Sequence, residues 1–337
     1  MKKITIVGGG LAGLGLAHGL RLHDVPVTLH EAGRYPRHRV CGEFLSGLDE
    51  STLATLGVTE DFADARRHLH GTWFRKGRTF LEFELPRPAL ALSRHRLDLR
   101  LKDRLESAGA QVVEGSRLGR SDSDGHVWAA GRLPRPGPWI GLKAHVTGLS
   151  LSTELEMHLG TNGYAGLTPV ENDRVNLCAL FRLDPERKGR GPALLLDYLR
   201  AGGNGLLAER LEAASIDETS YLGVAGFELG WQEGGESLCA VGDAAGMIPP
   251  FTGNGMSMAL QSAELALDPL VRWSRSERDW GSTLVRIREE TKRKFSRRVA
   301  AAMALHRILL DPRGASLAAA LSRFGVVPFR AILALVR

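Results

Sequence analysis

The residues with the clearest chemical meaning are three glycines near the start of the chain. Gly8, Gly10 and Gly13 have the spacing G-x-G-x-x-G. Glycines so spaced permit a tight turn, let the backbone approach a pyrophosphate and let a helix pack closely on a strand. The helix that begins at Leu11 and Ala12 would point its free N–H groups at that anion. Glu31 follows the next strand, where a carboxylate can accept hydrogen bonds from a ribose diol and favours FAD or NAD over NADP.

The elements around these residues support a dinucleotide site. Residues 4–7 are an apolar, β-branched run typical of a buried parallel strand. A helical pattern follows over residues 14–22, and residues 25–30 form a second strand. Strand, glycines, helix, strand and terminal acid within one unit of about 30 residues are far more specific than the glycines alone. The alternative is a glycine-rich turn in some other α/β protein.

A second stretch suited to chemistry runs from Gly242 to Met256. Asp243 follows the apolar residues 238–241, which we predict as a short strand, and its carboxylate could hold a ribose or ribityl hydroxyl. The loop that continues into a helix is stiff and poor in side chains, with Pro250, Gly253, Asn254, Gly255 and Met256. Its backbone N–H groups could approach a flat, electron-accepting ring, and the helix N-terminus would stabilise charge developing there. A plain strand–loop–helix junction is the alternative.

Length and composition indicate one large α/β unit or two joined ones. The chain has 337 residues, 43% hydrophobic, and no run of 18 apolar residues, so no transmembrane helix is predicted. The first strand begins at once, and we expect no signal or transit segment. The three cysteines, Cys41, Cys178 and Cys239, have no metal-ligand spacing. We therefore predict no metal site and a cytoplasmic location.

Basic residues are concentrated on one predicted helix, within the net charge of +6. Seven of them lie between residues 286 and 298: Arg286, Arg288, Lys292, Arg293, Lys294, Arg297 and Arg298. A solvated helix face is the simpler interpretation. An acidic partner, for instance a carrier protein, or peripheral contact with anionic lipid is the alternative. Nucleic acid is disfavoured because no aromatic residues are interleaved with the charges.

The remaining pattern predicts a second, antiparallel sheet and a helical end. A hairpin is expected over residues 72–84 with its turn at Lys76-Gly77, then a proline-rich connection over 86–91 and a long helix that begins within residues 92–98 and ends at Gly109. Alternating strands are predicted at 139–146, 154–159, 164–168 and 175–181, with Asn162-Gly163 as a hairpin turn. A strand at 111–114 and helices at 48–56, 193–201 and 204–214 complete this part. From Gly255 the chain is predicted to be helical, with breaks near Asp311-Pro312 and Val327-Pro328.

Both chemical stretches together resemble the flavoprotein hydroxylase superfamily, the group A monooxygenases with the fold of para-hydroxybenzoate hydroxylase. The resemblance runs from the start of the chain to about residue 265. Within this superfamily, Val40-Cys41-Gly42-Glu43-Phe44-Leu45-Ser46 resembles the branch of the geranylgeranyl reductases, and Ser93-Arg94 with Leu97-Asp98 also matches.

The resemblance implies an α/β fold with three parts. A Rossmann-like FAD-binding domain would comprise 1–70, 92–135 and 236–265. A substrate domain with an inserted antiparallel sheet would comprise 71–91 and 139–235, and 266–337 would be helical. FAD is the implied cofactor, with NADPH or NADH as electron donor.

It also implies roles for particular residues. Gly8, Gly10 and Gly13 would cradle the pyrophosphate, Glu31 would hold the adenosine ribose, and Arg94 and Asp243 would reach the ribityl–phosphate region. The backbone of 253–256 would face the flavin, which Arg39, Cys41 and Gly42 would border. For Cys41, a packed thiol and a participating one are both open. His145, His158, Tyr164 and Asn176 are polar residues of the predicted strands, but no general base is assigned.

The sequence departs from the family in two places. The Asp-Gly-Arg motif of relatives corresponds to Ala130-Gly131-Arg132, without the acid, and the segment between Glu114 and Trp139 is short. Asp124-Gly125 is a substitute but is more typical of a hairpin turn. Direct reduction by NADPH is therefore in question. The Trp-x-Trp-x-Ile-Pro signature of flavin halogenases is absent.

We therefore predict an FAD-dependent oxidoreductase that acts on a hydrophobic or aromatic small molecule in secondary metabolism. It would work by C4a-hydroperoxide monooxygenation or by hydride transfer to a carbon–carbon double bond. The alternative is a degenerate FAD-binding protein that serves a carrier protein as a scaffold. The apolar stretch 324–336 is predicted to be a packing helix, with a lipid-facing lid as the alternative.

Overall fold

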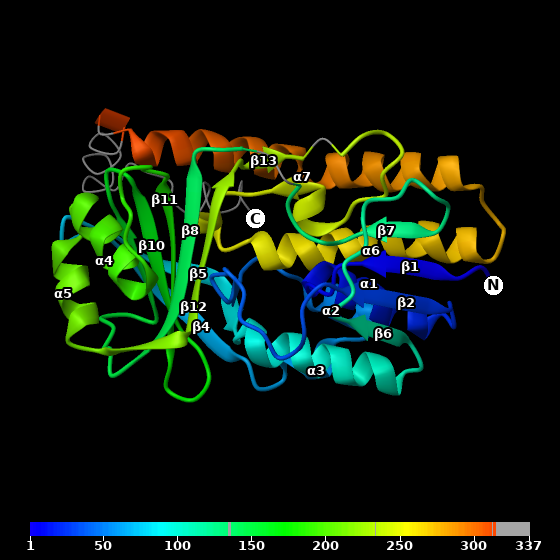
Figure 1. Ribbon diagram of the computed structural model, residues 1–337, viewed down its shortest axis with the longest axis horizontal. Coiled ribbons are helices and arrows are strands. Elements are labelled where there is room, and N and C mark those ends of the chain that lie inside the picture. Colours follow the sequence, from blue (N-terminus) through cyan, green and yellow to red (C-terminus); the bar gives the residue numbers. More distant parts are fainter. Residues whose placement is uncertain (134–135, 233, 312, 315–337) are drawn as a thin grey trace.

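The computed structural model describes residues 1–133, 136–232, 234–311 and 313–314. It has two lobes side by side, with one long helix running along both (Figure 1). A four-stranded parallel sheet forms the core of one lobe, and a larger curved sheet forms the other. The predicted α/β architecture is confirmed.

The parallel sheet has the order β6-β2-β1-β7. Its strands are β1 (Ile4–Val7), β2 (Val27–Glu31), β6 (Gln111–Glu114) and β7 (His126–Trp128). Ile4 and Ile6 on one face are fully buried and Val7 on the other is buried, as expected for a parallel strand covered on both faces. Helix α1 (Leu11–Leu22) connects β1 to β2 and packs against α3 (Arg94–Ser107) and α6 (Gly255–Ser274).

The larger sheet has eight strands in the order β12-β8-β11-β10-β9-β4-β5-β3. Their bounds are β3 (Phe44–Leu45), β4 (Arg66–Arg75), β5 (Arg78–Ala91), β8 (Trp139–Thr147), β9 (Leu155–Leu159), β10 (Gly163–Pro169), β11 (Val175–Arg182) and β12 (Ser215–Phe227). The predicted hairpins at Lys76-Gly77 and Asn162-Gly163 are present. The sheet is not wholly antiparallel, because β4 and β9 pair in parallel.

One face of the large sheet is covered by two helices, α4 (Gly191–Ala201) and α5 (Gly205–Glu212). Leu195 and Leu207 from these helices pack with Leu142, Leu167 and Leu177 of the strands. Side chains on a strand point alternately to its two faces, so the residues directly before and after each of these strand leucines face the first lobe. That second face is free to form the wall of a site.

The remaining elements are short or peripheral. They are α2 (Glu50–Leu56), the 3₁₀ turns η1 (Thr59–Phe62), η2 (Gly242–Ala244) and η3 (Pro250–Thr252), the strand pair β13 (Gly230–Trp231) and β14 (Gly246–Met247), and the long helix α7 (Trp280–Leu310). Among the helices of the described residues, none combines the length and apolarity needed to cross a membrane.

Several predicted elements were wrong. Residues 86–91, predicted as a connection, belong to β5; the prolines fit because the ladder with β4 is irregular between Glu84 and Ala89, where no N–H is required. Residues 238–241 are not a strand: Ala240 makes a single bridge to Trp128 of β7. The turn at Asp124-Gly125 leads into the parallel strand β7 and not into a hairpin. Strands β7 and β12 were not predicted.

The C-terminal part also differs from the prediction. The helix predicted from Gly255 onward is interrupted: α6 ends at Ser274, and Asp279 caps α7 by accepting a hydrogen bond from the Ser282 N–H. The break expected near Asp311 is present, since α7 ends at Leu310. The predictions at Val327-Pro328 and over 324–336 lie outside the described residues.

The basic face of α7 is smaller than predicted. Arg286, Lys292, Arg293, Lys294 and Arg297 are exposed. Arg298 is buried and donates a hydrogen bond to Gln261, and half-buried Arg288 donates one to the carbonyl of Glu236. An acidic partner for this face stays a prediction.

The contact of α1 with α6 gives a first testable prediction. Leu260 of α6 is fully buried, and a Cβ on Gly15 would lie 2.9 Å from its Cδ2 atom. Leu260→Ala should lower the free energy of unfolding by about 2–5 kcal/mol, because it leaves a cavity in this tight contact. The matched control is Leu206→Ala, at a leucine that is 59% exposed, measured in the same urea titration. Equal losses in the two variants would contradict the assigned core.

Candidate functional site

A cavity of about 970 Å³ lies between the two lobes. It begins at the carboxyl ends of the parallel strands, at Val7, Glu31 and Trp128, and extends to the open face of the large sheet at Gly166 and Cys178. Ligands of open α/β sheets bind at this end of the strands. The cavity is the natural candidate for the functional site.

The structure brings together residues predicted from separate parts of the sequence. The predicted site residues on the cavity wall are Gly8, Gly10, Leu11, Ala12, Glu31, Arg39, Cys41, Gly42, Arg94, Gly242, Asp243, Pro250, Gly253, Gly255 and Met256. Gly13 and Asn254 do not line it. Asn254 is buried at the N-cap of α6, and Gly13 packs α1 against the turn. These positions support the site map, while the binding roles remain predictions.

The glycine turn is built by close backbone contacts. Gly8 has φ +113°, and a Cβ there would lie 2.4 Å from the backbone of Ala129 and Ala130. A Cβ on Gly13 would lie 2.0 Å from the carbonyl oxygen of Gly8. Helix α1 has no side-chain cap at Gly10 and no acid in its first turn. Its N-terminus therefore presents free N–H groups to the cavity, as an anion site requires.

Glu31 is held more firmly than the sequence suggested. Its Oε2 accepts hydrogen bonds from the Gly9 N–H (2.9 Å) and Arg39 (3.2 Å). Its Oε1 accepts from the Gly33 N–H (2.8 Å) and Arg37 (2.9 Å). Burial raises the pKa of Glu31, but Arg39, Gly33 and Arg37 outweigh this and lower it overall. A ribose would have to displace one of these four donors, and Arg37, whose side chain is 40% exposed, is the most accessible.

Arginines surround the same region. Arg94 donates to both carboxylate oxygens of Asp98 (2.6 and 2.8 Å), and Arg39 donates to Asp98 Oδ2 (2.7 Å). Burial lowers the pKa of Arg94, but the neighbouring Asp98 raises it overall. Arg37, Arg39, Arg94, Arg117 and Arg132 reach the cavity wall, against the acids Glu31, Glu156 and Asp243. This surplus of positive charge suits a pyrophosphate.

Asp243 extends into the cavity from the start of η2. Its side chain is accessible there, yet the surrounding protein desolvates it and raises its pKa to about 6, although Arg94 and Arg132 act in the opposite direction. Asp243 can therefore exchange between an acceptor and a donor of hydrogen bonds near neutral pH. Either form can bind a hydroxyl group.

Cys41 lies half-buried on the cavity wall, where its Sγ accepts a hydrogen bond from the Glu43 N–H (3.4 Å). Burial raises its pKa above the ordinary value of 9.0. The side chain is thus a neutral thiol at pH 7, which favours the packed alternative over a thiolate nucleophile.

The polar strand residues have different surroundings. Asn176 donates to the carbonyl of Cys41 (3.0 Å), and His145 bonds Glu43 (2.7 Å), so both fasten the loop that borders the cavity. His158 bonds Glu156 (2.9 Å), an ordinary structural pair. The fourth polar strand residue, Tyr164, lines the cavity, and the other three do not.

The end of the cavity near the large sheet is aromatic, which the sequence did not reveal. Phe44, Trp73, Phe83, Tyr164, Phe227 and Phe251 line it, together with Met157 and Leu180. The Tyr164 hydroxyl can donate to Nδ1 of His306 on α7 (3.4 Å). The Trp73 and Tyr164 rings each meet Phe251 edge to face, at 6.2 and 5.8 Å. Such walls suit a flat, apolar ligand.

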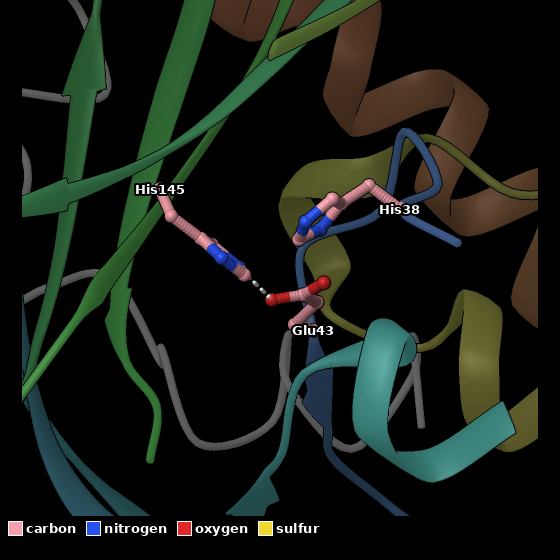
Figure 2. Close-up of side chains that lie close together, drawn as sticks. All are labelled: His38, Glu43 and His145. Carbon is pink, nitrogen blue, oxygen red and sulfur yellow. Dashed lines mark hydrogen bonds and ion pairs between the residues drawn. The ribbon is translucent and has the colours of Figure 1, made fainter. Parts of the chain in front are cut away.

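Three potential metal ligands, His38, Glu43 and His145, lie together beside this cavity (Figure 2). Their ligand atoms are within 4.8 Å of one another. Lys143, fully buried, lies 3.1 Å from Nδ1 of His38 and 3.6 Å from Glu43 Oε1. Sequence reasoning missed Lys143 and the role of Glu43, although a lysine in the largely apolar strand β8 was a signal.

Two histidines, half-buried His38 and buried His306, predict a pH dependence of stability. Burial and nearby positive charge lower the pKa of His38 and of His306 from 6.5 to about 4. Between these values the unfolded chain binds more protons, so stability is full above pH 6.5 and falls as the pH falls toward 4. From pH 7 to pH 5 each histidine should cost about 1–2 kcal/mol. In denaturant titrations at both pH values, His306→Phe should show a smaller fall than the wild type. An equal fall would contradict the assignment.

Comparisons with known proteins agree with this geometry. No protein-family model matches the chain. A methylenetetrahydrofolate–tRNA-(uracil-5-)-methyltransferase, TrmFO, of Myxococcus xanthus is 28% identical over 221 residues, 59% of this chain and 41% of that protein. A menaquinone reductase of Mycolicibacterium smegmatis is 25% identical over 359 aligned residues, 91% of this chain and 85% of that protein.

Solved structures are similar over almost the whole chain. PqsL of Pseudomonas aeruginosa in complex with 2-aminobenzoylacetate has a TM-score of 0.71 at 17% identity, with 93% of this chain and 98% of that one covered. Klebsiella pneumoniae HpxO complexed with FAD has 0.76 at 18% identity, with 98% and 97% covered. The flavin-dependent brominase Bmp2 has 0.78 at 16% identity, with 99% and 92% covered.

The specific resemblance of residues 40–46 to geranylgeranyl reductases gains no support from these comparisons. The broader resemblance is supported at the level of the fold, because PqsL, described as a probable FAD-dependent monooxygenase, and the p-nitrophenol 4-monooxygenase PnpA are similar over 94% and 100% of this chain. The chain has the fold of the group A flavoprotein monooxygenases.

Proposed function

We propose that this protein is an FAD-dependent oxidoreductase that acts on an aromatic small molecule, with monooxygenation as the first candidate reaction. The observation that carries the proposal is the continuity of the cavity. One space joins the glycine turn at Gly8 and Gly10 to the aromatic walls at Trp73 and Tyr164. A continuous site with a dinucleotide end and an aromatic end is what a flavin enzyme for an aromatic substrate needs.

The chain's own residues fit FAD. The N-terminus of α1 at Leu11 and Ala12 would bind the pyrophosphate, and Arg94 and Asp243 would hold the adjoining hydroxyl and phosphate groups. The backbone from Gly253 to Met256, at the start of α6, would face the ring system. When bound, FAD would supply two-electron redox chemistry, and the protein would supply orientation and exclusion of water.

The aromatic end of the cavity supports the substrate class. Its wall offers faces and edges of rings, while the Tyr164 hydroxyl is a polar group that can orient a ligand. PqsL, which shares the fold, was solved with 2-aminobenzoylacetate, an aromatic compound. We infer an aromatic substrate of comparable size. A role in secondary metabolism, an acidic carrier protein and a cytoplasmic location remain predictions.

Reduction of a double bond in a hydrophobic substrate is the second candidate. Its support is the similarity to a menaquinone reductase along 91% of this chain, together with residues 40–46. An apolar chamber would suit either substrate.

Retention of FAD tests the proposed site. Gly13→Ala should strip the cofactor from the purified protein, because the added Cβ would lie 2.0 Å from the carbonyl oxygen of Gly8. The control is Gly205→Ala, where a Cβ meets nothing within 4 Å. Asp243→Ala should raise the dissociation constant for FAD about tenfold or more, whereas Asp268→Ala on the outer surface of α6 should not. Full retention of FAD in both site variants, read from the visible spectrum, would refute the site.

The electron donor is tested by anaerobic titration of the visible spectrum with NADPH and then NADH. We expect slow bleaching by either donor, because Ala130 replaces the acid of the family motif. Ala130→Asp should accelerate it severalfold. On admission of air with an aromatic substrate, a monooxygenase should give a hydroxylated product, whereas a reductase should consume the double bond without oxygen. A protein that holds FAD but is reduced by no donor and converts no substrate would support the scaffold alternative.

A further inference from the structure

A buried polar cluster joins the loop of residues 38–43 to strand β8, just behind the cavity wall. We call His38, Glu43, Lys143 and His145 the Glu43 cluster. Figure 2 shows His38, Glu43 and His145. Glu43, Lys143 and His145 are fully buried. Charged groups in the interior are unfavourable unless they are paired, so a strand that carries both a lysine and a histidine needs an explanation beyond packing.

Glu43 is the centre of this cluster. Its Oε2 bonds Nε2 of His145 (2.7 Å), as Figure 2 shows, and its Oε1 accepts from the backbone N–H of Arg94 (3.0 Å) and lies 3.6 Å from Nζ of Lys143. Glu43 also has φ +52°, a conformation that a residue with a side chain rarely adopts. Surrounding contacts must hold this conformation, and those of the carboxylate are among them, beside the backbone contacts with Cys41 and Leu92.

The partners of Glu43 belong to three elements that face the cavity. Its own loop supplies Cys41 and Gly42 to the cavity wall, and Asn176 fixes the same loop through the Cys41 carbonyl. Arg94 opens helix α3 and places its guanidinium on the wall. Lys143 and His145 belong to β8 of the large sheet. One carboxylate thus ties the dinucleotide side of the cavity to the sheet that carries the aromatic side.

A metal ion is the competing explanation of the cluster. Two imidazoles and a carboxylate are ligands that transition metals accept. Lys143, however, already occupies this space, because its Nζ lies next to both His38 Nδ1 and Glu43 Oε1. Burial lowers the pKa of Lys143, and the neighbouring Glu43 favours its charged form. A divalent ion among these ligands would meet that charge, so the arrangement favours an ion-pair cluster.

We propose that Glu43, paired with Lys143, is a positioning residue: it sets the placement of the 39–42 loop and of Arg94 relative to the large sheet, and so how FAD is held against the substrate. The FAD part of this inference rests on the proposed function. The carboxylate does not line the cavity and acts through its neighbours.

Binding of FAD to variants of the full chain tests the proposal. Glu43→Gln keeps the size and the acceptor for Arg94 but removes the charge that Lys143 pairs with. We expect the dissociation constant for FAD to rise at least tenfold and the visible flavin bands to shift. The control is Asp61→Asn, a fully buried carboxylate paired with Arg104 away from the cavity. It should lower thermal stability comparably yet change FAD affinity less than twofold.

A double-mutant cycle tests the pairing. Lys143→Met should weaken FAD binding as Glu43→Gln does, and Lys143→Arg should restore most of the affinity. The double variant should bind FAD no more weakly than whichever single variant binds it less tightly, because the two substitutions disrupt the same interaction. If the fold-change in the dissociation constant of the double variant equals the product of the two single fold-changes, the pairing is overturned. Unchanged affinity and spectrum in Glu43→Gln would overturn the positioning role.

Two further measurements separate this proposal from the proposed function. Amide hydrogen exchange of residues 38–46 needs no cofactor: it should accelerate at least tenfold in Glu43→Gln and not in Asp61→Asn. Equal exchange would refute the proposal even if FAD binds; failure of the wild type to bind FAD would refute the function alone. Cobalt(II) added to the wild type should give no ligand-field absorption, and an intense visible band would assign the cluster to a metal instead.

Discussion

The structure depends on one close contact, between the start of α1 and the turn that precedes it. Gly13 lies against the carbonyl oxygen of Gly8, so near that no side chain fits between them, and Gly8 in turn lies against the backbone of Ala129. This contact fixes α1 to the carboxyl ends of β1 and β7 and aims its free N–H groups into the cavity. It also brings α1 close to α6, whose own N-terminus opens on the same space. Two helix N-termini thereby converge on one site.

Charge is organised around that contact by buried or half-buried ion pairs. Glu31 pairs with Arg37 and Arg39, and Asp98 pairs with Arg39 and Arg94. Glu43 pairs with Lys143 and His145. Such pairs rarely add much stability, because the cost of desolvation offsets the attraction. Their value is geometric: the pairs of Glu31 and Asp98 hold flexible arginines in one position on the cavity wall, and those of Glu43 hold Lys143 and His145 behind it. A pocket for a charged, extended ligand needs this pre-organisation more than it needs strength.

In the second lobe, one face of the large sheet packs against helices and the other face lines the cavity. Leucines on one face pack under α4 and α5, which makes the sheet rigid. The other face carries small and aromatic residues, with Gly141 and Gly166 beside Tyr164 and Met157, and it leaves room for a ligand. Polar groups on this face at β8 and β11 reach the loop of the first lobe and hold the two lobes together. The cavity is therefore a product of the interface between the lobes.

The sequence by itself determined what depends on neighbouring residues. The glycine turn, β1, α1 and β2, and the hairpins at Lys76-Gly77 and Asn162-Gly163, are local patterns, and each is present because turn geometry and hydrophobic period are encoded within a few residues. The stretch from Gly242 to Met256 was also predicted to reach a cofactor, and it does line the cavity.

Only the tertiary structure decided what depends on distant partners. Strand β7 has three residues and forms through its pairing with β1. Strand β12 lies at the edge of the large sheet and forms through its pairing with β8. Neither has a hydrophobic periodicity that would predict a strand. The four donors on Glu31, the aromatic end of the cavity and the Glu43–Lys143 pair all join residues far apart in sequence. These contacts form because charged groups and aromatic rings lose water where the two lobes meet. Which residues meet there cannot be inferred from a single sequence.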